Sequence, residues 1–193
     1  MAAFVLACAL ALPLSYTRAH AQAPAPEAAA VTEAKSLRAV RSPQAKARLK
    51  ALAAAERDGA VRARLTSILG SIESKRLAAE DFDAALADAD PQVRLAGATA
   101  LGKLGGAAAE ARLVKLLAAD PAAGVRMNAA FWLGQASHRS AAAALGKALA
   151  ADADANVRVA AAQALSRMGG AGARRELKKG ATDADERVRA WAK

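Results

Sequence analysis

The sequence is poor in the residue types from which most reactive or crosslinked sites are built. It holds one cysteine, two histidines and only three Phe, two Trp and one Tyr in 193 residues. One cysteine cannot form a disulfide framework, and a zinc-type site needs three or four protein ligands. So few aromatic rings also argue against a stacking platform for single-stranded nucleic acid. We therefore expect no disulfide scaffold and no His- or Cys-rich metal site.

Alanine dominates what is present, with 61 of the 193 residues. Alanine is the best helix former, so the expected fold class is all-α. A hydrophobic content of 54% is too high for a long disordered chain. Lys and Arg number 28 against 18 Asp and Glu, which gives a formal net charge of +10 and makes an acidic surface a candidate partner.

The first 21 residues are expected to be a signal peptide that is removed. Residues 4–14 form an apolar run that is too short for a membrane-spanning helix, which needs about 20 residues. Ala19, His20 and Ala21 then supply a small-x-small cleavage pattern. We expect cleavage near Ala21, a periplasmic or secreted mature chain without a transmembrane segment, and a linker with an N-terminal helical segment over 22–42. The alternative is a cytosolic protein with an ordinary N-terminal helix.

A motif recurs every 31 or 32 residues in the part of the chain after residue 43. The dipeptide Val-Arg begins at positions 61, 93, 125, 157 and 188. A fixed period of this length is typical of a repeat architecture, in which each unit is one supersecondary structure. Each unit is expected to form two helices, A and B, and the B helix begins just before Val-Arg. The A helices are expected near 75–87, 107–119, 140–151 and 171–181.

Residues that start and stop helices occupy matching places in the repeats. Ser42, followed by Pro43, is expected to cap the first A helix, and Ser140 a later one. Gly105-Gly106 and Gly169-Gly170 are expected to end B helices in the left-handed conformation. An aspartate three residues before the valine is expected to cap four B helices: Asp58, Asp90, Asp154 and Asp185.

On a helical wheel of 100° per residue, each B helix has an apolar stripe and a more polar arc. Counted from the valine as position 0, positions +4, +7 and +8 form the stripe and are expected in the core. Positions +3, +6 and +10 form the arc. Trp132 falls on the stripe, whereas Phe131 places an apolar ring on the arc, where it could anchor a partner. The predicted partner-binding residues are Thr99, Lys103, Asn128, Phe131, Gln135, Gln163 and Arg167.

The recurring signature Asp-x-x-Val-Arg-x-x-Ala-x-x-Ala-Leu-Gly resembles the HEAT-like repeat family, in its short phycobilin-lyase (PBS-lyase) form. The resemblance covers residues 43–193. It implies an α-α superhelix, that is, an α-solenoid of about four to five helical hairpins whose B helices line the concave face. It also implies a scaffold that binds other proteins, similar to exported HEAT repeat domain-containing proteins.

An acidic residue lies six positions before every repeat arginine. In the family these residues form a ladder in the turns between helices, so the resemblance implies a structural role. A carboxylate can accept from the unpaired N–H groups of a turn, and the arginine fork can serve a carboxylate from two directions. The alternative is that five periodic arginines bind a polyanion. The ladder residues are Glu56 and Arg62, Asp88 and Arg94, Asp120 and Arg126, Asp152 and Arg158, and Asp183 and Arg189.

No catalytic grouping is recognisable in the sequence. Some HEAT-like enzymes bind iron through His-Glu pairs, and this sequence has no such pair. His138 has no Ser-Asp or Cys grouping around it. We expect a non-enzymatic scaffold without a cofactor or a metal. The alternatives are a lyase-like or cofactor-handling enzyme or enzyme chaperone, and a cytosolic nucleic-acid binder, although nucleic acid is not the favoured partner of an exported protein.

Overall fold

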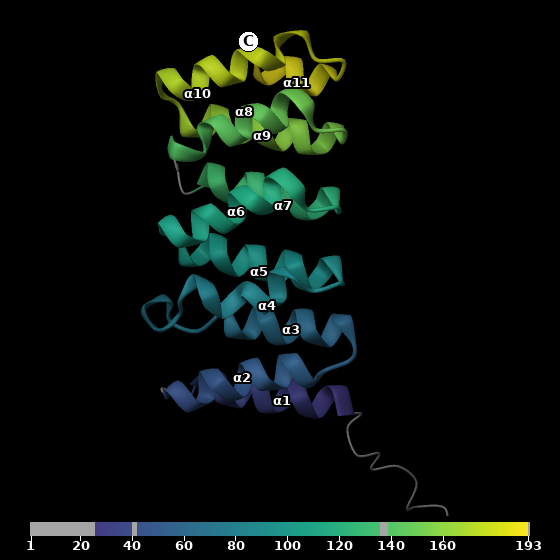
Figure 1. Cartoon of the computed structure of the whole chain (residues 1–193), viewed down its shortest axis with the longest axis vertical. Coiled ribbons are helices and arrows are strands. Elements are labelled where there is room, and N and C mark those ends of the chain that lie inside the picture. The colour runs from purple at the N-terminus through teal and green to yellow at the C-terminus, as the bar shows by residue number, and fades with distance from the viewer. Residues whose placement is uncertain (1–25, 40–41, 136–138, 193) are drawn as a thin grey trace, which may run out of the picture.

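A computed structural model describes residues 26–39, 42–135 and 139–192, and every regular element in these ranges is a helix (Figure 1). The expected signal peptide, its cleavage site near Ala21, and His138 lie outside the described residues. Eleven α-helices and four 3-10 helices follow one another as α1 (Pro26–Ala39), α2 (Pro43–Ala55), α3 (Gly59–Leu69), η1 (Ser74–Arg76), η2 (Ala79–Phe82), α4 (Asp83–Leu86), α5 (Pro91–Leu104), α6 (Ala107–Ala119), α7 (Ala123–Gln135), η3 (Arg139–Ala141), α8 (Ala142–Ala151), α9 (Ala155–Met168), α10 (Gly170–Leu177), η4 (Lys178–Thr182) and α11 (Glu186–Trp191).

The helices form hairpins that stack along the long axis of the molecule (Figure 1). The B helices are α3, α5, α7, α9 and α11, and each packs on the next one in the stack. Each B helix also packs on the A element of its own repeat, as α3 does on α2 and α7 on α6. The predicted all-α solenoid is therefore confirmed.

The repeated valine is the most regular position of the core: Val61, Val93, Val125, Val157 and Val188 are all buried. The leucines at position +8, from Leu69 to Leu165, are buried as well. The apolar stripe is thus largely as predicted, although Ile68 and Trp132 at position +7 are only half-buried. Burying a leucine or valine side chain contributes about 1.5–3 kcal/mol, so these two positions supply a stabilising layer in each of the first four repeats.

The predicted caps of the B helices are present. The carboxylates of Asp58, Asp90, Asp154 and Asp185 each accept a backbone N–H of the first turn. In α9, for example, Asp154 Oδ1 accepts from the amide of Asn156 at 2.7 Å. At the other end, Gly105 and Gly169 have φ values of 70° and 63°, which a residue with a side chain rarely adopts.

One of the two predicted serine caps is wrong. Ser42 caps α2, since its hydroxyl accepts from the amide of Ala45 at 3.1 Å. Ser140 does not cap α8, because Ala141 occupies the cap position. The hydroxyl of Ser140 donates instead to the carboxylate of Glu110 in the preceding A helix. A charged acceptor makes a stronger hydrogen bond than a neutral one, which explains this choice of partner.

The A element of the second repeat also differs from the prediction, because residues 75–87 do not form one helix. The segment is broken into η1, η2 and the four-residue α4. Asp81 Oδ2 accepts from the amide of Ala78 at 2.9 Å and pairs with Lys46 Nζ at 3.0 Å. An aspartate that bonds to nearby backbone competes with helix formation. Phe82 is fully buried and anchors the irregular segment to the core.

Helix α1 closes the N-terminal end of the array and lies within the helical segment expected over 22–42. It packs on both α2 and α3, and its residues Val31 and Ala34 are buried. An ion pair between Arg48 Nε and Glu33 Oε1 at 2.6 Å joins α1 to α2. None of the described helices is long and apolar enough to span a bilayer.

Candidate partner-binding face

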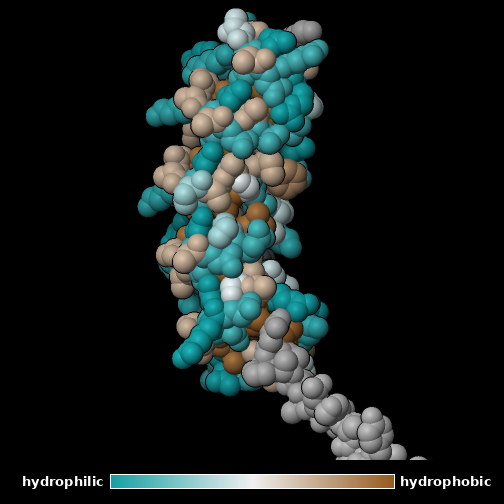
Figure 2. All heavy atoms as spheres, turned by 90° about the vertical axis from the view of Figure 1, so that its right-hand side faces the viewer, coloured by the Kyte–Doolittle hydropathy of each residue, from teal (hydrophilic) through white to brown (hydrophobic). Residues whose placement is uncertain are grey.

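The ladder residues meet at the turns between A and B helices. Arg94 illustrates the arrangement, with Nε and Nη2 donating to the two carboxylate oxygens of Asp120 in the next repeat at 2.8 and 3.0 Å. Its Nη1 donates to the backbone carbonyls of Asp88 and Ala89 in its own repeat at 2.8 and 3.0 Å. Hydrophilic residues run along this edge of the molecule (Figure 2). The same forward pairing joins Arg62 to Asp88, Arg126 to Asp152, and Arg158 to Asp183.

The two outermost ladder residues make local contacts only, as far as the described residues show. The carboxylate of Glu56 accepts from the amides of Arg57 and Asp58. Arg189 donates to the carbonyls of Asp183 and Ala184 at 2.7 and 2.9 Å. Residues six positions apart are therefore linked through a backbone carbonyl, whereas the carboxylate pairing runs to the following repeat.

The ladder carboxylates are held in their charged form. Hydrogen bonds from Arg62 lower the pKa of Asp88 from its ordinary value. Burial raises the pKa of Asp120, but the hydrogen bonds and charge of Arg94, together with a backbone amide, outweigh burial and leave the pKa lowered. The aspartates of the following two joints show the same net lowering of the pKa. Each arginine fork therefore meets a full negative charge, as a structural joint between repeats requires.

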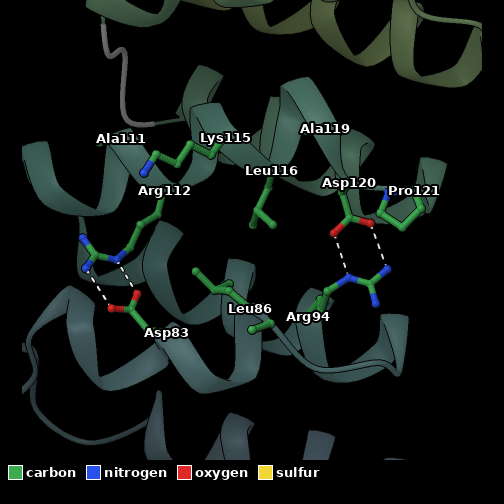
Figure 3. Close-up of a pocket in the computed structure, with 11 residues that line it drawn as sticks. Asp83, Leu86, Arg94, Ala111, Arg112, Lys115, Leu116, Ala119, Asp120 and Pro121 are labelled. Atoms are coloured by element: carbon green, nitrogen blue, oxygen red, sulfur yellow. Dashed lines mark hydrogen bonds and ion pairs between the residues drawn. The ribbon is translucent and has the colours of Figure 1, made fainter.

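The ladder ion pairs also line the grooves between neighbouring A elements. A cavity of about 700 Å³ lies between α4 and α6 (Figure 3). The pair Arg94–Asp120 lies at one end of it, and Arg112 at the other end donates to Asp83 Oδ1 at 2.7 Å. The guanidinium groups in this cavity already have partners within the protein, so we place the candidate site on the opposite layer.

We call the solvent-facing side of α3, α5, α7 and α9 the B face. All seven predicted partner-binding residues are exposed or half-buried there. Thr99 Oγ1 donates to Asn128 Oδ1 at 3.4 Å, which links α5 to α7. Within the described ranges, no hydrogen bond or ion pair joins Lys103, Gln135 or Gln163 to the other predicted residues.

Phe131 and Arg167 form the most specific feature of the B face. The Phe131 ring is 41% exposed, and the Cζ atom of Arg167 lies 5.7 Å from its centroid. Trp132 supports the ring edge-on, with 5.3 Å between centroids. Trp132 itself lies on Gly102 of α5, where an added Cβ would come within 2.1 Å of the indole. An aromatic anchor under a guanidinium is thus held in place by packing from the neighbouring repeat.

Three contributors to the B face were missed by the wheel. Met127 at position +2 is 42% exposed, beside Phe131 on the same helix. Gln92 and Asn156 are also exposed and stand at position −1, directly before the valine. Position −1 lies between +6 and +10 on the wheel, so counting backwards from the valine would have found them.

A groove at the N-terminal end of the B face was not predicted either. It has a volume of about 500 Å³ and is bounded by α1, α3 and α5. Val31, Ile68 and Leu95 line it with apolar surface, while Lys35 and Arg64 supply positive charge. The groove was not predicted because the helical part of residues 22–42 was not expected to contribute to the B face.

Matches to known families and structures agree with this architecture. A family model described as HEAT repeats matches residues 51–128 and 110–193. The chain belongs to the HEAT repeat family. No curated protein matches the sequence. Among the described residues, no group of three or more His, Cys, Asp or Glu side chains could hold a metal ion.

Solved structures of other helical-repeat proteins superpose on this HEAT repeat chain. The CpcE–CpcF complex of phycocyanin lyase from Nostoc sp. PCC7120 matches with a TM-score of 0.58 and 26% identity, covering 80% of this chain and 65% of that one. Human deoxyhypusine hydroxylase matches with a TM-score of 0.55 and 19% identity, covering 88% and 78%. A designed armadillo repeat protein in complex with a (KR)4 peptide matches with a TM-score of 0.55 and 18% identity, covering 89% and 92%.

Proposed function

We propose that the protein is an exported, non-enzymatic scaffold that binds a protein partner through the B face. The exposed Phe131 ring under Arg167 is the observation that carries this proposal. Buried aromatic and arginine side chains dominate the binding energy of protein interfaces, and here the two are already arranged in the free protein. The amides of Asn128, Gln135 and Gln163 lie on the same two helices, α7 and α9, and can both donate and accept hydrogen bonds.

The proposed periplasmic location rests on the sequence of residues 1–21. Fractionation of cells expressing the full chain with a C-terminal tag is the direct test. We expect the product in the periplasmic fraction, shorter than the full chain by the leader, with Gln22 as its first residue. A full-length product in the cytosol would refute the export proposal and leave the B-face proposal standing.

A pull-down from a periplasmic extract tests the B face. We expect the full chain to retain a partner that the variants Phe131→Ala and Gln135→Ala retain much less. Lys147→Ala is the matched control, because Lys147 is exposed on α8, which belongs to the A layer formed by α2, α4, α6, α8 and α10. Circular dichroism should show the same helix content for all variants. Undiminished capture by Phe131→Ala would overturn the proposed site.

A further inference from the structure

The B face differs in charge from the rest of the molecule. Helices α3, α5, α7 and α9 contain no aspartate or glutamate in their whole length. The A layer, in contrast, carries acidic groups such as Asp81, Asp83 and Glu110. The B face exposes positive charge at Lys103 and Arg167, and Lys35 of α1 borders its N-terminal groove.

From this asymmetry we propose that the B face binds an extended acidic peptide segment of its partner. The inference deepens the proposed function and depends on it. The surface has a counterpart for each element of such a segment. The three cations can pair with carboxylates, and the groove and the Phe131 ring can take apolar side chains.

The groove supplies the first subsite. Its floor of Val31, Ile68 and Leu95 suits one large aliphatic side chain, and no carboxylate is among the residues that line it. Lys35 of α1 borders this space. A carboxylate next to the aliphatic residue would therefore meet the positive charge of Lys35.

The Phe131–Arg167 pair supplies the second subsite. Arg167 makes no ion pair with any carboxylate of the described residues, in contrast to the forward-paired ladder arginines. A guanidinium that stacks on a ring keeps its N–H edge available for a carboxylate, and the ring limits its rotamers. Met127 and Phe131, each about two-fifths exposed, provide the adjoining apolar contact.

The distance between the subsites sets the length of the segment. Packed helices lie about 8–10 Å apart, so the three steps from α3 to α9 span roughly 25–30 Å. An extended chain advances about 3.3 Å per residue and needs about eight or nine residues to cover that distance. The occupant is thus a segment of about ten residues.

A nucleic acid fits this surface less well than a peptide does. The three cations lie on separate helices, α1, α5 and α9, whereas binding along a phosphate backbone requires a dense series of contacts. Apolar side chains line most of the groove, which would leave a phosphate poorly solvated. Phe131 is the one exposed aromatic ring on the described B face, too little for stacking successive bases.

Fluorescence anisotropy with labelled peptides and the full chain tests the proposal. The probe is a ten-residue peptide in which pairs of glutamates alternate with pairs of leucine or phenylalanine residues. Each face of the extended chain then carries both kinds of side chain. One comparison peptide replaces each glutamate by glutamine, another replaces it by lysine, and a ten-nucleotide single-stranded DNA serves as the polyanion. We expect the glutamate peptide to bind at least about tenfold more tightly than the other three probes and to weaken with added salt.

Charge-reversal variants locate the binding. Arg167→Glu and Lys35→Glu should each weaken the glutamate peptide by about fivefold or more, and Lys147→Glu on the A layer should change it by less than about twofold. All three lower the net charge equally, so the comparison separates a site from overall attraction. Equal weakening by Lys147→Glu, tighter binding of the lysine peptide, or tighter binding of DNA would overturn the proposal.

Different results would refute the acidic-peptide inference and the proposed function. If Phe131→Ala abolishes capture of a partner while the glutamate peptide does not bind, the acidic-peptide inference is wrong and the B face still stands. If Phe131→Ala leaves capture unchanged, the proposed function itself is wrong.

Discussion

Removing the side chain of Arg94 should destabilise the array strongly, because this is the most deeply buried joint. Arg94 is 8% exposed, and the side chain of its partner Asp120 is only 2% exposed. The variant Arg94→Ala removes two charge-assisted hydrogen bonds to Asp120 and two bonds to backbone carbonyls. Breaking a buried pair by deleting one partner costs about 3–5 kcal/mol.

The lower end of that range is the expected value. Asp120 keeps one hydrogen bond, from the amide of Ala122 at 2.9 Å, and water can enter the joint beside the cavity between α4 and α6. We therefore expect a loss of about 3 kcal/mol, which corresponds to a fall in Tm of roughly 6–12 °C for a domain of this size. Thermal and urea unfolding followed by circular dichroism measure this change. Midpoints are the quantity to compare, since repeat arrays can depart from two-state unfolding.

Arg189→Ala is the matched control, because Arg189 bonds to backbone carbonyls and to no carboxylate of the described residues. It should cost at most about 1 kcal/mol, the scale of an ordinary hydrogen bond. Combining Arg94→Ala with Asp120→Asn should recover part of the loss, since the buried charge is then gone. Equal midpoints for Arg94→Ala and Arg189→Ala would refute the reasoning that forward pairing stabilises the joint.

Three further predictions follow from local features. Gly102→Ala should lower the free energy of unfolding by about 1–3 kcal/mol and change the fluorescence of Trp132, because the new Cβ would overlap the indole. The control Gly124→Ala has open space around the new Cβ and should be neutral or slightly stabilising. Asp154→Ala should lower the unfolding free energy by about 0.5–2 kcal/mol through loss of the α9 cap, and an unchanged urea midpoint would contradict this. The folded-state pKa of Asp120 and of the equivalent Asp152 is lowered, so their ionised form stabilises the fold fully at pH values above the unfolded pKa of about 3.9. This stabilisation is lost as the pH falls through the folded-state pKa values, so Tm should drop steeply below about pH 4. A Tm that is flat down to about pH 2 would count against this prediction.

Much of the fold was predictable because each repeat contains the local sequence signals that start, end and bury its helices. The valine at position 0, the aspartate cap and the glycine ends are local signals, and their repetition removes the ambiguity that a single instance would leave. The second A element was not predictable by this route. Asp81 looks like any helical aspartate in the sequence, and its role depends on Lys46, which is distant along the chain and becomes a neighbour only in the fold.

The candidate site was predictable in position but not in its contacts. The wheel placed Phe131 on the solvent-facing arc, and it is 41% exposed there. The wheel could not show that Arg167 lies over the ring, or that Gly102 makes room for Trp132, because both facts depend on the spacing of neighbouring helices. The groove at α1 was missed for the same reason, since Lys35 reaches the B face only through packing between elements.

The forward pairing of the ladder has a consequence for how such a protein can change over evolution. Each of the middle units offers a donor fork on one side and a carboxylate on the other, and the joint has the same geometry whichever unit follows. The last spacing is one residue shorter, yet Arg158 still meets Asp183 at 2.8 Å, because the missing residue falls in the helices between these two residues and leaves both turns unchanged. Duplicating or removing one whole period therefore leaves every ladder connection chemically complete, so the length of the array can vary by unequal recombination without redesigning the ladder.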